Sequence, residues 1–543
     1  MDISMSRNNI DTFGQMMEKA SGLLTISQAS KWASEYLGRN VTTSNISYLI
    51  QYGRIRKAAN DGKTLINKED LIKYYESYIG RRENDWINKL GDDLNWNLSF
   101  DYLKESDRTK HVHRLHPYKG KFIPQLVEYF LDSHVDSYKT ETYFKKGDIV
   151  LDPFCGSGTT LVQANELGMH AIGIDVSSFN ALISNVKVSK YNPVELYHEV
   201  RRVTSALKEF TLGSNTQEFQ YKLTKVLTDF NNKYFPSPDF KIRVRRGEIN
   251  EDHYGQAKAA ELKPIYQDLI NQYNISLNHV KTHNFLDKWY IEPIRNEIDF
   301  VRNLIEQVQD SNIRNALVII LSRTLRSCRA TTHFDLATLK EPILSTYYCH
   351  KHGKICKPLF SILEWWIRYS QDTIKRLAQF DKLRTNTIQV CLTGDSRSID
   401  IRQDLEQQDN TFTKLIPDQR IKGIFSSPPY VGLIDYHDQH AYAYDLFRFE
   451  RRDHLEIGTL SKGQGIEARE TYVESISQVL NNCRRFLSDG FHIFLVANDK
   501  YNLYPAIAQK SDLRIVNQFK RPVLCRTERD KGAYSETIFH LRA

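Results

Sequence analysis

Two short apolar runs, each followed by a polar loop, stand out in the pattern of hydrophobic and polar positions. The run at 149–152 ends in a carboxylate, and the run at 421–425 ends before two serines. A buried parallel strand has this pattern where its carboxyl end opens into a site. A third run at 170–175 follows a helical segment, which predicts a right-handed strand–helix–strand crossover. The pattern resumes further on, at 388–397, 491–496, 513–519 and 536–541. We therefore expect an α/β fold with a doubly wound sheet.

A stretch of mostly helical pattern separates the two groups of strands. It covers 191–385, roughly 195 residues, which is far too long for a loop and predicts an inserted domain. The sheet domain is then divided into halves at 110–190 and 386–543. The insertion carries basic clusters with Arg243, Arg245, Arg246, Arg323, Arg326 and Arg329.

Residues 21–80 have the pattern of a small unit of their own. Helices are expected at 26–33 and 42–50, followed by a hairpin within 53–66 and a third helix from residue 68. This order resembles winged helix-turn-helix modules of the excisionase type, which bind DNA.

The helix-turn-helix resemblance implies specific DNA contacts. Its second helix would enter the major groove, and its hairpin would contact phosphates. The residues concerned are Thr43, Ser44, Asn45, Arg54 and Arg56. A helical protein-docking domain is the alternative interpretation. The polar stretch from 81 to about 110 is expected to be a linker.

Bulk properties narrow the class of protein. The 543 residues exceed what one core usually contains, and 41% are hydrophobic, as in ordinary globular proteins. The net charge of +8 permits a nucleic-acid partner without requiring one. No apolar run approaches membrane-spanning length and the first residues lack a signal-peptide pattern, so we expect a cytoplasmic protein without a membrane partner.

The loop after the first run can hold a charged nucleoside. Gly156 and Gly158 let the backbone approach a ligand closely. Asp152 can accept hydrogen bonds from an ammonium group, and Asp175, 17 residues after Gly158, can accept them from ribose hydroxyls. There is no third glycine in phase and no Gly-Lys-Ser/Thr triplet, so a nucleoside without pyrophosphate fits better than a dinucleotide.

The loop after the second run suits a flat base with an exocyclic amino group. Ser427 Oγ and the Pro428 carbonyl can accept the two N–H hydrogens and favour a tetrahedral nitrogen. Pro428 and Pro429 stiffen the turn, so the acceptors are fixed before the base arrives. Tyr430 can stack on a base that has left the duplex. In isolation this tetrapeptide could also be a rigid surface turn.

Together these segments resemble the S-adenosylmethionine-dependent DNA amino-methyltransferases. Residues 151–160 resemble their motif I, 116–122 their motif X, and 393–396 their third-strand motif. The resemblance implies a seven-stranded, Rossmann-like class I methyltransferase sheet. It implies S-adenosylmethionine contacts from Lys121, Phe122, Asp152, Phe154, Gly156, Gly158, Thr159, Asp175 and Asp395, the last toward the adenine amino group.

The same resemblance implies the reaction and its setting. A serine such as Ser427 usually marks cytosine-N4 enzymes of this family, while aspartate or asparagine marks adenine-N6 enzymes. We expect a site-specific methyltransferase acting on double-stranded DNA, as the modification enzyme of a restriction or phage-defence system with a cognate endonuclease. The alternatives are an adenine-N6 enzyme, an RNA amino-methyltransferase and a DNA-binding regulator with a degenerate methylase fold. The helix-turn-helix favours duplex DNA over RNA.

Soft metal ligands occur close together in the insertion. Cys349, His352 and Cys356, with Cys328 or His333, have the composition of a tetrahedral structural zinc site. The spacing is loose, and ordinary buried thiols near a loop are an equal alternative.

Overall fold

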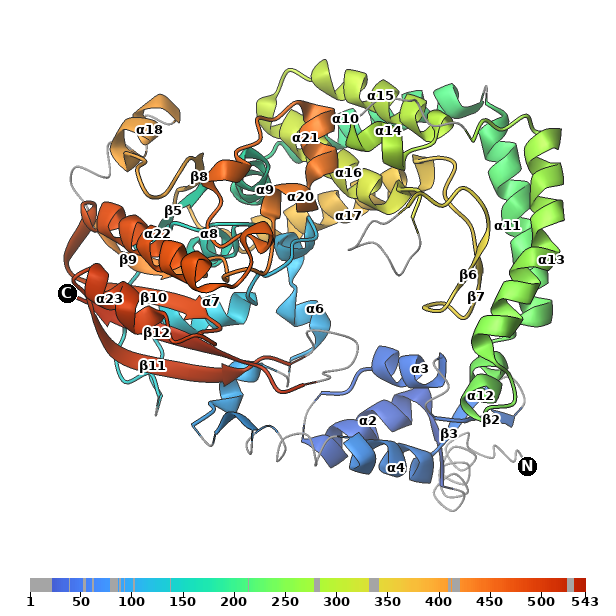
Figure 1. Ribbon diagram of the computed structural model, residues 1–543, viewed down its shortest axis with the longest axis horizontal. Helices are drawn as coiled ribbons and strands as arrows, with labels where there is room; N and C mark the ends of the chain where they lie inside the picture. The colour runs from blue at the N-terminus through green and yellow to red at the C-terminus, as the bar shows by residue number, and fades with distance from the viewer. Residues whose placement is uncertain are drawn as a thin grey trace, which may run out of the picture.

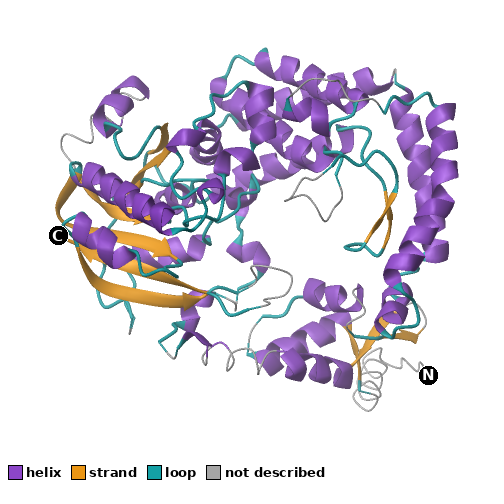
Figure 2. Ribbon diagram, in the orientation of Figure 1, coloured by secondary structure: helices purple, strands orange, loops and turns teal. Residues whose placement is uncertain are grey.

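The computed structural model describes most of the chain. The described residues are 22–38, 40–51, 55–60, 63–78, 86, 89–91, 93–100, 103–136, 138–212, 214–277, 284–331, 341–408, 412, 420–524 and 532–543. In the view of Figure 1, the central sheet, the helical insertion and the N-terminal unit follow one another around the molecule. Long helices of the insertion lie on the side opposite the sheet. Figure 2 shows the strands of this sheet together, with shorter strands in the N-terminal unit and in the insertion.

The central sheet has seven strands in the order β11-β12-β10-β9-β4-β5-β8. They are β4 (Ile149–Asp152), β5 (His170–Asp175), β8 (Gln389–Thr393), β9 (Ile421–Ser426), β10 (Leu487–Ala497), β11 (Arg514–Pro522) and β12 (Ser535–Arg542). All neighbours pair in parallel except β12, which is antiparallel to β10 and β11. This order and direction confirm the class I methyltransferase fold expected from the sequence.

Strand β4 lies inside the sheet, between β9 and β5, and its apolar side chains are buried on both faces. Alternate residues point to opposite sides of a sheet. Val150 belongs to one buried cluster, whereas Ile149 and Leu151 belong to another. Helices α7 (Pro124–Leu131), α8 (Thr159–Glu166) and α9 (Ser178–Val188) supply the first cluster, and α18 (Ile401–Gln408), α22 (Ile466–Arg484) and α23 (Tyr504–Lys510) the second. The sheet is therefore covered on both faces.

The insertion is mainly helical, as expected. Its helices are α10 (Pro193–Leu212), α11 (Asn215–Tyr234), α12 (Asp239–Arg245), α13 (Glu251–Gln272), α14 (Phe285–Trp289), α15 (Glu292–Glu306), α16 (Ser311–Cys328) and α17 (Leu363–Asp381). A two-stranded hairpin, β6 (Tyr347–Cys349) and β7 (Lys354–Cys356), interrupts them. A strand of three residues is too short to show the alternation of apolar and polar residues that predicts a strand, so the sequence did not indicate this hairpin.

The N-terminal unit has the elements of a winged helix-turn-helix. They are β1 (Leu23–Thr25), α2 (Ile26–Leu37), α3 (Thr43–Gln51), β2 (Lys57–Asn60), β3 (Lys63–Asn67) and α4 (Lys68–Tyr78), with the strands in the order β1-β3-β2. A buried cluster of its own includes Ala29, Ile46 and Leu71. Thr25 is the N-cap of α2 and forms a capping box with Gln28, which fixes the start of this helix.

Part of the expected linker is packed structure. The turn η1 (Trp96–Ser99) contacts β11, and the Asn95 N–H donates to the Lys520 carbonyl at 2.8 Å. Leu98 and Phe100 are buried in the core of the sheet domain. In the sequence these two apolar residues stand among polar ones, so the segment has the composition of a linker. None of the described helices is long and apolar enough to span a membrane.

Candidate active site

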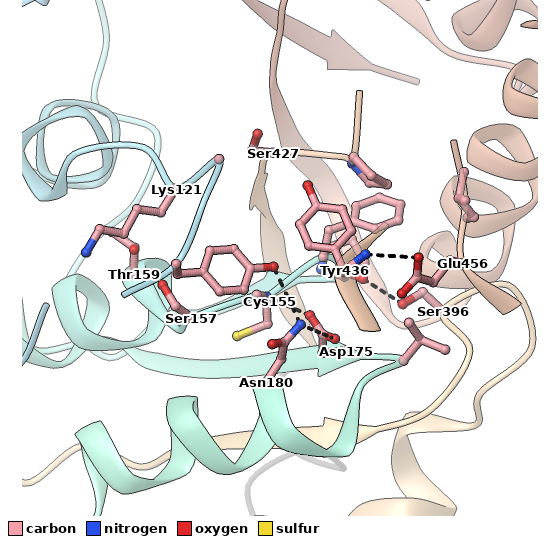
Figure 3. Close-up of a pocket in the computed structure, with 18 of the residues that line it drawn as sticks. Lys121, Cys155, Ser157, Thr159, Asp175, Asn180, Ser396, Ser427, Tyr436 and Glu456 are labelled. Carbon is pink, nitrogen blue, oxygen red and sulfur yellow. Dashed lines mark hydrogen bonds between the residues drawn. The ribbon is translucent and has the colours of Figure 1, made fainter. Parts of the chain in front are cut away.

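One pocket is lined by residues from both halves of the sheet domain. Gly156 follows β4, Asp175 ends β5, and Ser427 and Pro429 follow β9. Figure 3 labels Asp175 and Ser427 among the side chains that line this pocket. They meet because β4 pairs in parallel with both β5 and β9, so the three carboxyl ends lie at the same edge. The predicted residues that line this pocket are Lys121, Phe122, Phe154, Gly156, Thr159, Asp175, Asp395, Ser427 and Pro429. Asp152, Gly158, Pro428 and Tyr430 lie beside it without lining it.

The loop between β4 and α8 requires its two glycines. Gly156 has a φ of 52°, and a Cβ there would lie 2.9 Å from the Tyr118 hydroxyl. Gly158 has a φ of 75°, and a Cβ there would lie 3.0 Å from the Cα of Ser184. The buried Lys187 ammonium donates to the Ser157 carbonyl between them. The backbone of this loop is therefore held close to the pocket with no side chain in between.

Asp175 organises the loop as well as the end of β5. Its carboxylate accepts hydrogen bonds from the Gly156 N–H at 2.8 Å, the Ser177 N–H at 2.9 Å and the Asn180 amide at 3.1 Å. Burial raises the pKa of Asp175 to about 6, and these hydrogen bonds oppose the rise. The group is therefore an ionised acceptor at neutral pH that lines the pocket, and its contact to a ribose stays a prediction.

Asp152 joins β4 to β9 rather than lining the pocket. It is 1% exposed and accepts hydrogen bonds from the Ser426 hydroxyl and, at 3.2 Å, from the Phe154 N–H. Burial raises the pKa of Asp152 to about 6. Its observed partners are protein groups, so a contact to a ligand ammonium stays a prediction.

The segment before α7 forms a wall of the pocket. The Lys121 ammonium is turned away from the pocket, as Figure 3 shows, and donates to the His113 carbonyl at 2.6 Å. Burial lowers the pKa of Lys121 to about 8. Tyr118, which the sequence did not single out, stacks on Tyr436 with ring centroids 5.9 Å apart. This wall is therefore aromatic and uncharged where it faces the pocket.

The loop after β8 closes the pocket at the edge of β5. Asp395 forms an ion pair with Arg397 at 2.8 Å. The Ser396 hydroxyl donates to the Pro153 carbonyl at 2.6 Å, which ties this loop to the loop after β4. The Asp395 carboxylate lines the pocket, and the Arg397 guanidinium balances its charge. A contact between Asp395 and an adenine amino group stays a prediction.

The tetrapeptide after β9 and the loop that follows it are each held by a carboxylate. The Tyr430 hydroxyl donates to Glu536 of β12 at 2.9 Å, and Glu536 is paired with Arg521 of β11 at 3.3 Å. The following loop is held by Glu456, which accepts from the N–H groups of Tyr436 at 3.1 Å and His437 at 2.7 Å.

The sequence missed several pocket residues. Tyr118 lies inside a segment whose function was recognised, and Asn180 follows Asp175 by five positions, so both could have been proposed. Glu456 and Tyr436 lie in irregular loops and gave no signal. Their role is visible only when the loops are placed in space.

The proposed DNA-contacting residues are only partly described. Thr43 and Asn45 lie at the start of α3, and Asn45 is exposed. The Asn45 side chain accepts hydrogen bonds from the Thr42 N–H and hydroxyl, both at 2.9 Å, so its oxygen caps the helix. Arg56 is exposed just before β2. Arg54 and the side chain of Ser44 lie outside the described residues.

The structure brings together three of the four proposed metal ligands. Ligand atoms of Cys349, His352 and Cys356 all lie within 4.8 Å of one another. Cys328 is buried at the end of α16 and does not belong to this group. His333, the other proposed fourth ligand, lies outside the described residues. Among the residues that the structure describes, the group is a triad, and a fourth protein ligand stays a prediction.

Comparisons with known proteins extend the likeness beyond these segments. A family model of N6 and N4 methyltransferases, described as DNA methylase, matches residues 3–185. The chain is 45% identical over 530 residues to the type II methyltransferase M.MjaII of Methanocaldococcus jannaschii, covering 97% of this chain and 98% of that protein. It is 27% identical over 154 residues to the type II methyltransferase M.MvaI of Kocuria varians, covering 28% and 32%. It is also 35% identical over 109 residues to a tRNA (guanine(10)-N2)-dimethyltransferase of Methanocaldococcus jannaschii, covering 20% and 28%.

Proposed function

Because this chain belongs to the DNA amino-methyltransferase family, we propose that it methylates the N4 nitrogen of cytosine at a specific sequence of double-stranded DNA. The observation that carries the proposal is the shared pocket, in which Gly156 and Asp175 face Ser427 and Pro429. A methyl donor and an extruded base can meet in this pocket.

The pocket fits S-adenosylmethionine, whose sulfonium supplies an electrophilic methyl group. Three carboxylates line it, Asp175, Asp395 and Glu456. Lys121 is the one basic side chain among the described lining residues, and its ammonium is turned to a carbonyl. A phosphate would be disfavoured in such a site, and a cation with a nucleoside favoured. Asp175 would accept the ribose hydroxyls, and the Gly156 backbone would leave room for the ligand.

The acceptor half works by fixing the amino group of the base. The Ser427 hydroxyl and the Pro428 carbonyl accept its two N–H hydrogens, so the nitrogen lone pair is released from the ring and directed at the methyl group. The Tyr430 ring stacks on the base, a contact worth about 1–3 kcal/mol. The nitrogen loses one proton after transfer, and water can take it because the methylated nitrogen is strongly acidic. No general base is needed.

Cytosine is proposed because the first position of the tetrapeptide is a serine. A hydroxyl accepts one N–H hydrogen while remaining neutral, and Ser427 is half-buried and lines the pocket. Duplex DNA is supported by the winged N-terminal unit, since a helix such as α3 fits the major groove of B-form DNA and not that of an A-form helix.

Modification-aware sequencing of DNA tests the reaction, the base and the target together. We expect 4-methylcytosine at one short sequence in cells that express the chain, and a much smaller modified fraction at that sequence in cells that express Ser427→Ala. Methyladenine at that sequence would overturn the base assignment. Methyl transfer to tRNA with none to DNA would overturn the substrate.

A role in a restriction or phage-defence system is supported by the relatives, two of which are named type II methyltransferases. In that role the methyl mark protects DNA from a cognate endonuclease, and the N-terminal unit adds DNA affinity or represses the gene's own promoter. We expect a plasmid modified by this chain to resist an endonuclease that cleaves the same sequence. Cleavage at fully modified sites would contradict the role.

A further inference from the structure

A short hairpin in the insertion brings together three side chains that can ligate a metal ion. β6 ends at Cys349, β7 ends at Cys356, and His352 lies in the turn between them. Both thiols are buried and free of disulfide bonds. The site lies far along the chain from the loops of the active site, and the proposed reaction does not use it.

The register of the hairpin places both sulfur atoms on one face. Cys349 is paired with Lys354, and Tyr347 is paired with Cys356. Cross-strand partners point to the same side of a two-stranded sheet, as do residues two apart. Cys349 and Cys356 are therefore diagonal neighbours on that side, close enough to share a small ligand.

The turn folds His352 back onto the same face. The Cys349 carbonyl accepts hydrogen bonds from the His352 N–H at 3.1 Å and the Gly353 N–H at 2.7 Å. Gly353 has a φ of 60°, which lets the chain reverse there. The turn brings His352 Nδ1 to 3.4 Å from Cys356 Sγ.

These distances fit a tetrahedral ion. With Zn–N of about 2.05 Å and Zn–S of about 2.3 Å, a tetrahedral angle separates the two ligand atoms by roughly 3.6 Å. The observed 3.4 Å is close to this value, and the three ligand atoms lie within 4.8 Å of one another. Two thiols and an imidazole are also the donors that favour zinc over magnesium or calcium.

We propose that Cys349, His352 and Cys356 bind one Zn²⁺ ion, with a water molecule as the fourth ligand. Binding releases the two thiol protons, so the charges of two thiolates cancel that of the ion. Within the described part of the chain, no further cysteine, histidine or carboxylate joins the group. His352 and Cys356 line a cavity with Arg329 and Lys357, which leaves room for the water.

The ion stabilises a hairpin that is otherwise small. The Asn231 side chain of α11 donates to the Ile355 carbonyl and accepts from its N–H, both at 2.9 Å. The Tyr348 hydroxyl donates to Glu251 of α13 at 2.7 Å. These contacts attach the strands to the long helices, and the ion holds the turn to the strands. Two strands of three residues need such support.

The hairpin has a consequence for DNA binding that rests on the proposed function. It lies on the inner side of α11 and α13, toward the rest of the molecule (Figure 1). Lys351 and Lys354 are exposed on it. The ion would fix the backbone that carries these two lysines, and we infer that their ammonium groups contact DNA phosphates.

Metal analysis of the full-length protein tests the site without reference to activity. We expect one zinc per chain after purification without chelators. We expect at least a fivefold loss in Cys349→Ala, His352→Ala and Cys356→Ala. Cys328→Ala is the matched control, a buried cysteine of the same insertion, and should keep its zinc. Folded wild-type protein with less than about 0.2 zinc per chain after zinc addition and dialysis would overturn the proposal, as would equal loss in Cys328→Ala.

Replacement of the ion by Co²⁺ identifies the ligands directly. We expect visible d–d bands of a tetrahedral ion and near-ultraviolet bands from sulfur-to-cobalt charge transfer in wild type. Both should be weaker in Cys356→Ala. Bound cobalt without the sulfur bands would show that the thiols are not ligands and would overturn the assignment.

A second readout separates the site from the proposed function. Removal of zinc should weaken duplex DNA binding at least tenfold and leave S-adenosylmethionine affinity unchanged. Stoichiometric zinc whose removal leaves DNA affinity unchanged would overturn the role of the hairpin in DNA binding, while the metal site itself would stand. Stoichiometric zinc in a chain that methylates no DNA would likewise separate the two proposals.

Discussion

The backbone N–H of Gly156 donates a 2.8 Å hydrogen bond to the carboxylate of Asp175, across the ends of two neighbouring strands. The glycine loop and the acidic end of β5 are thus one unit before any ligand binds. The carboxylate that we expect to hold a ribose also fixes the loop that faces the rest of the nucleoside. Substitutions at Asp175 should therefore weaken the binding of the cofactor more than the binding of DNA.

Replacement of Asp175 by asparagine should weaken S-adenosylmethionine binding about 10- to 100-fold. The amide is close in size, but it carries no charge and offers one acceptor oxygen to the three donors and the ribose. Isothermal titration calorimetry measures the affinity. Asp148→Asn, in the turn before β4, is the matched control and should bind normally. Equal affinity in Asp175→Asn would refute the ribose assignment.

The pH dependence of cofactor binding should follow the ionisation of Asp175. Burial raises the pKa of Asp175 to about 6, so the acceptor is lost as pH falls through 6 and affinity should drop between pH 7 and 5. Because the folded pKa lies above an unfolded value of about 3.9, the free energy of unfolding of the cofactor-free protein should move oppositely and decrease as pH rises from about 4 to 6. Burial also raises the pKa of Asp152 to about 6, so the Asp175→Asn profile is the control. A wild-type affinity that does not change across pH 6 would count against the prediction.

Ser427→Ala should lower turnover about 100-fold while cofactor affinity stays within twofold of wild type. The side chain lines the pocket next to Pro429, but it belongs to the acceptor half of the site. Removal of one preorganised polar contact to a reacting group commonly costs about 100- to 1000-fold in kcat. Single-turnover methyl transfer to duplex DNA measures the step. Ser106→Ala, an exposed serine that does not line the pocket, is the control. Turnover near that of wild type would remove Ser427 from the mechanism.

Arg56→Ala should weaken DNA binding at all sequences alike. The side chain is exposed beside the wing and is expected to contact a phosphate. Loss of one such contact should reduce the slope of log affinity against log salt concentration by about 1. Fluorescence anisotropy over a range of salt concentrations gives the slope. Lys510→Ala removes one exposed charge from α23, where it pairs with Glu474, and should leave the slope unchanged. An unaltered slope in Arg56→Ala would argue for protein docking instead.

The sequence indicated the sheet and the two principal loops for a physical reason. A strand buried on both faces, such as β4, is continuously apolar and ends where polar residues begin, so its position and the loop after it are visible together. Contacts made between distant segments leave no such local trace. Glu456 supports the loop after the tetrapeptide, and Leu98 packs under the sheet from a polar stretch. Neither could be recognised before the chain was folded.

The hydrogen bond from Tyr430 to Glu536 should position the Tyr430 ring for catalysis. The Glu536 carboxylate accepts from the Tyr430 hydroxyl at 2.9 Å and is itself paired with Arg521, so β11 and β12 set the direction of the ring. Tyr430→Phe keeps the ring and loses this support, and it should lower kcat several-fold with little change in KM for DNA. Tyr430→Ala also loses stacking of about 1–3 kcal/mol, which corresponds to roughly 5- to 150-fold weaker productive binding of the base.

Glu536 variants separate positioning from a purely structural role. Glu536→Gln retains an acceptor oxygen and should keep most activity, whereas Glu536→Ala should reproduce the kcat defect of Tyr430→Phe. In the double variant Tyr430→Phe, Glu536→Ala, the two defects should not add, because both act through one hydrogen bond. Steady-state kinetics on duplex DNA, with thermal melting to confirm the fold, provides the measurement. Additive losses in the double variant would show that Glu536 does not act through the direction of Tyr430.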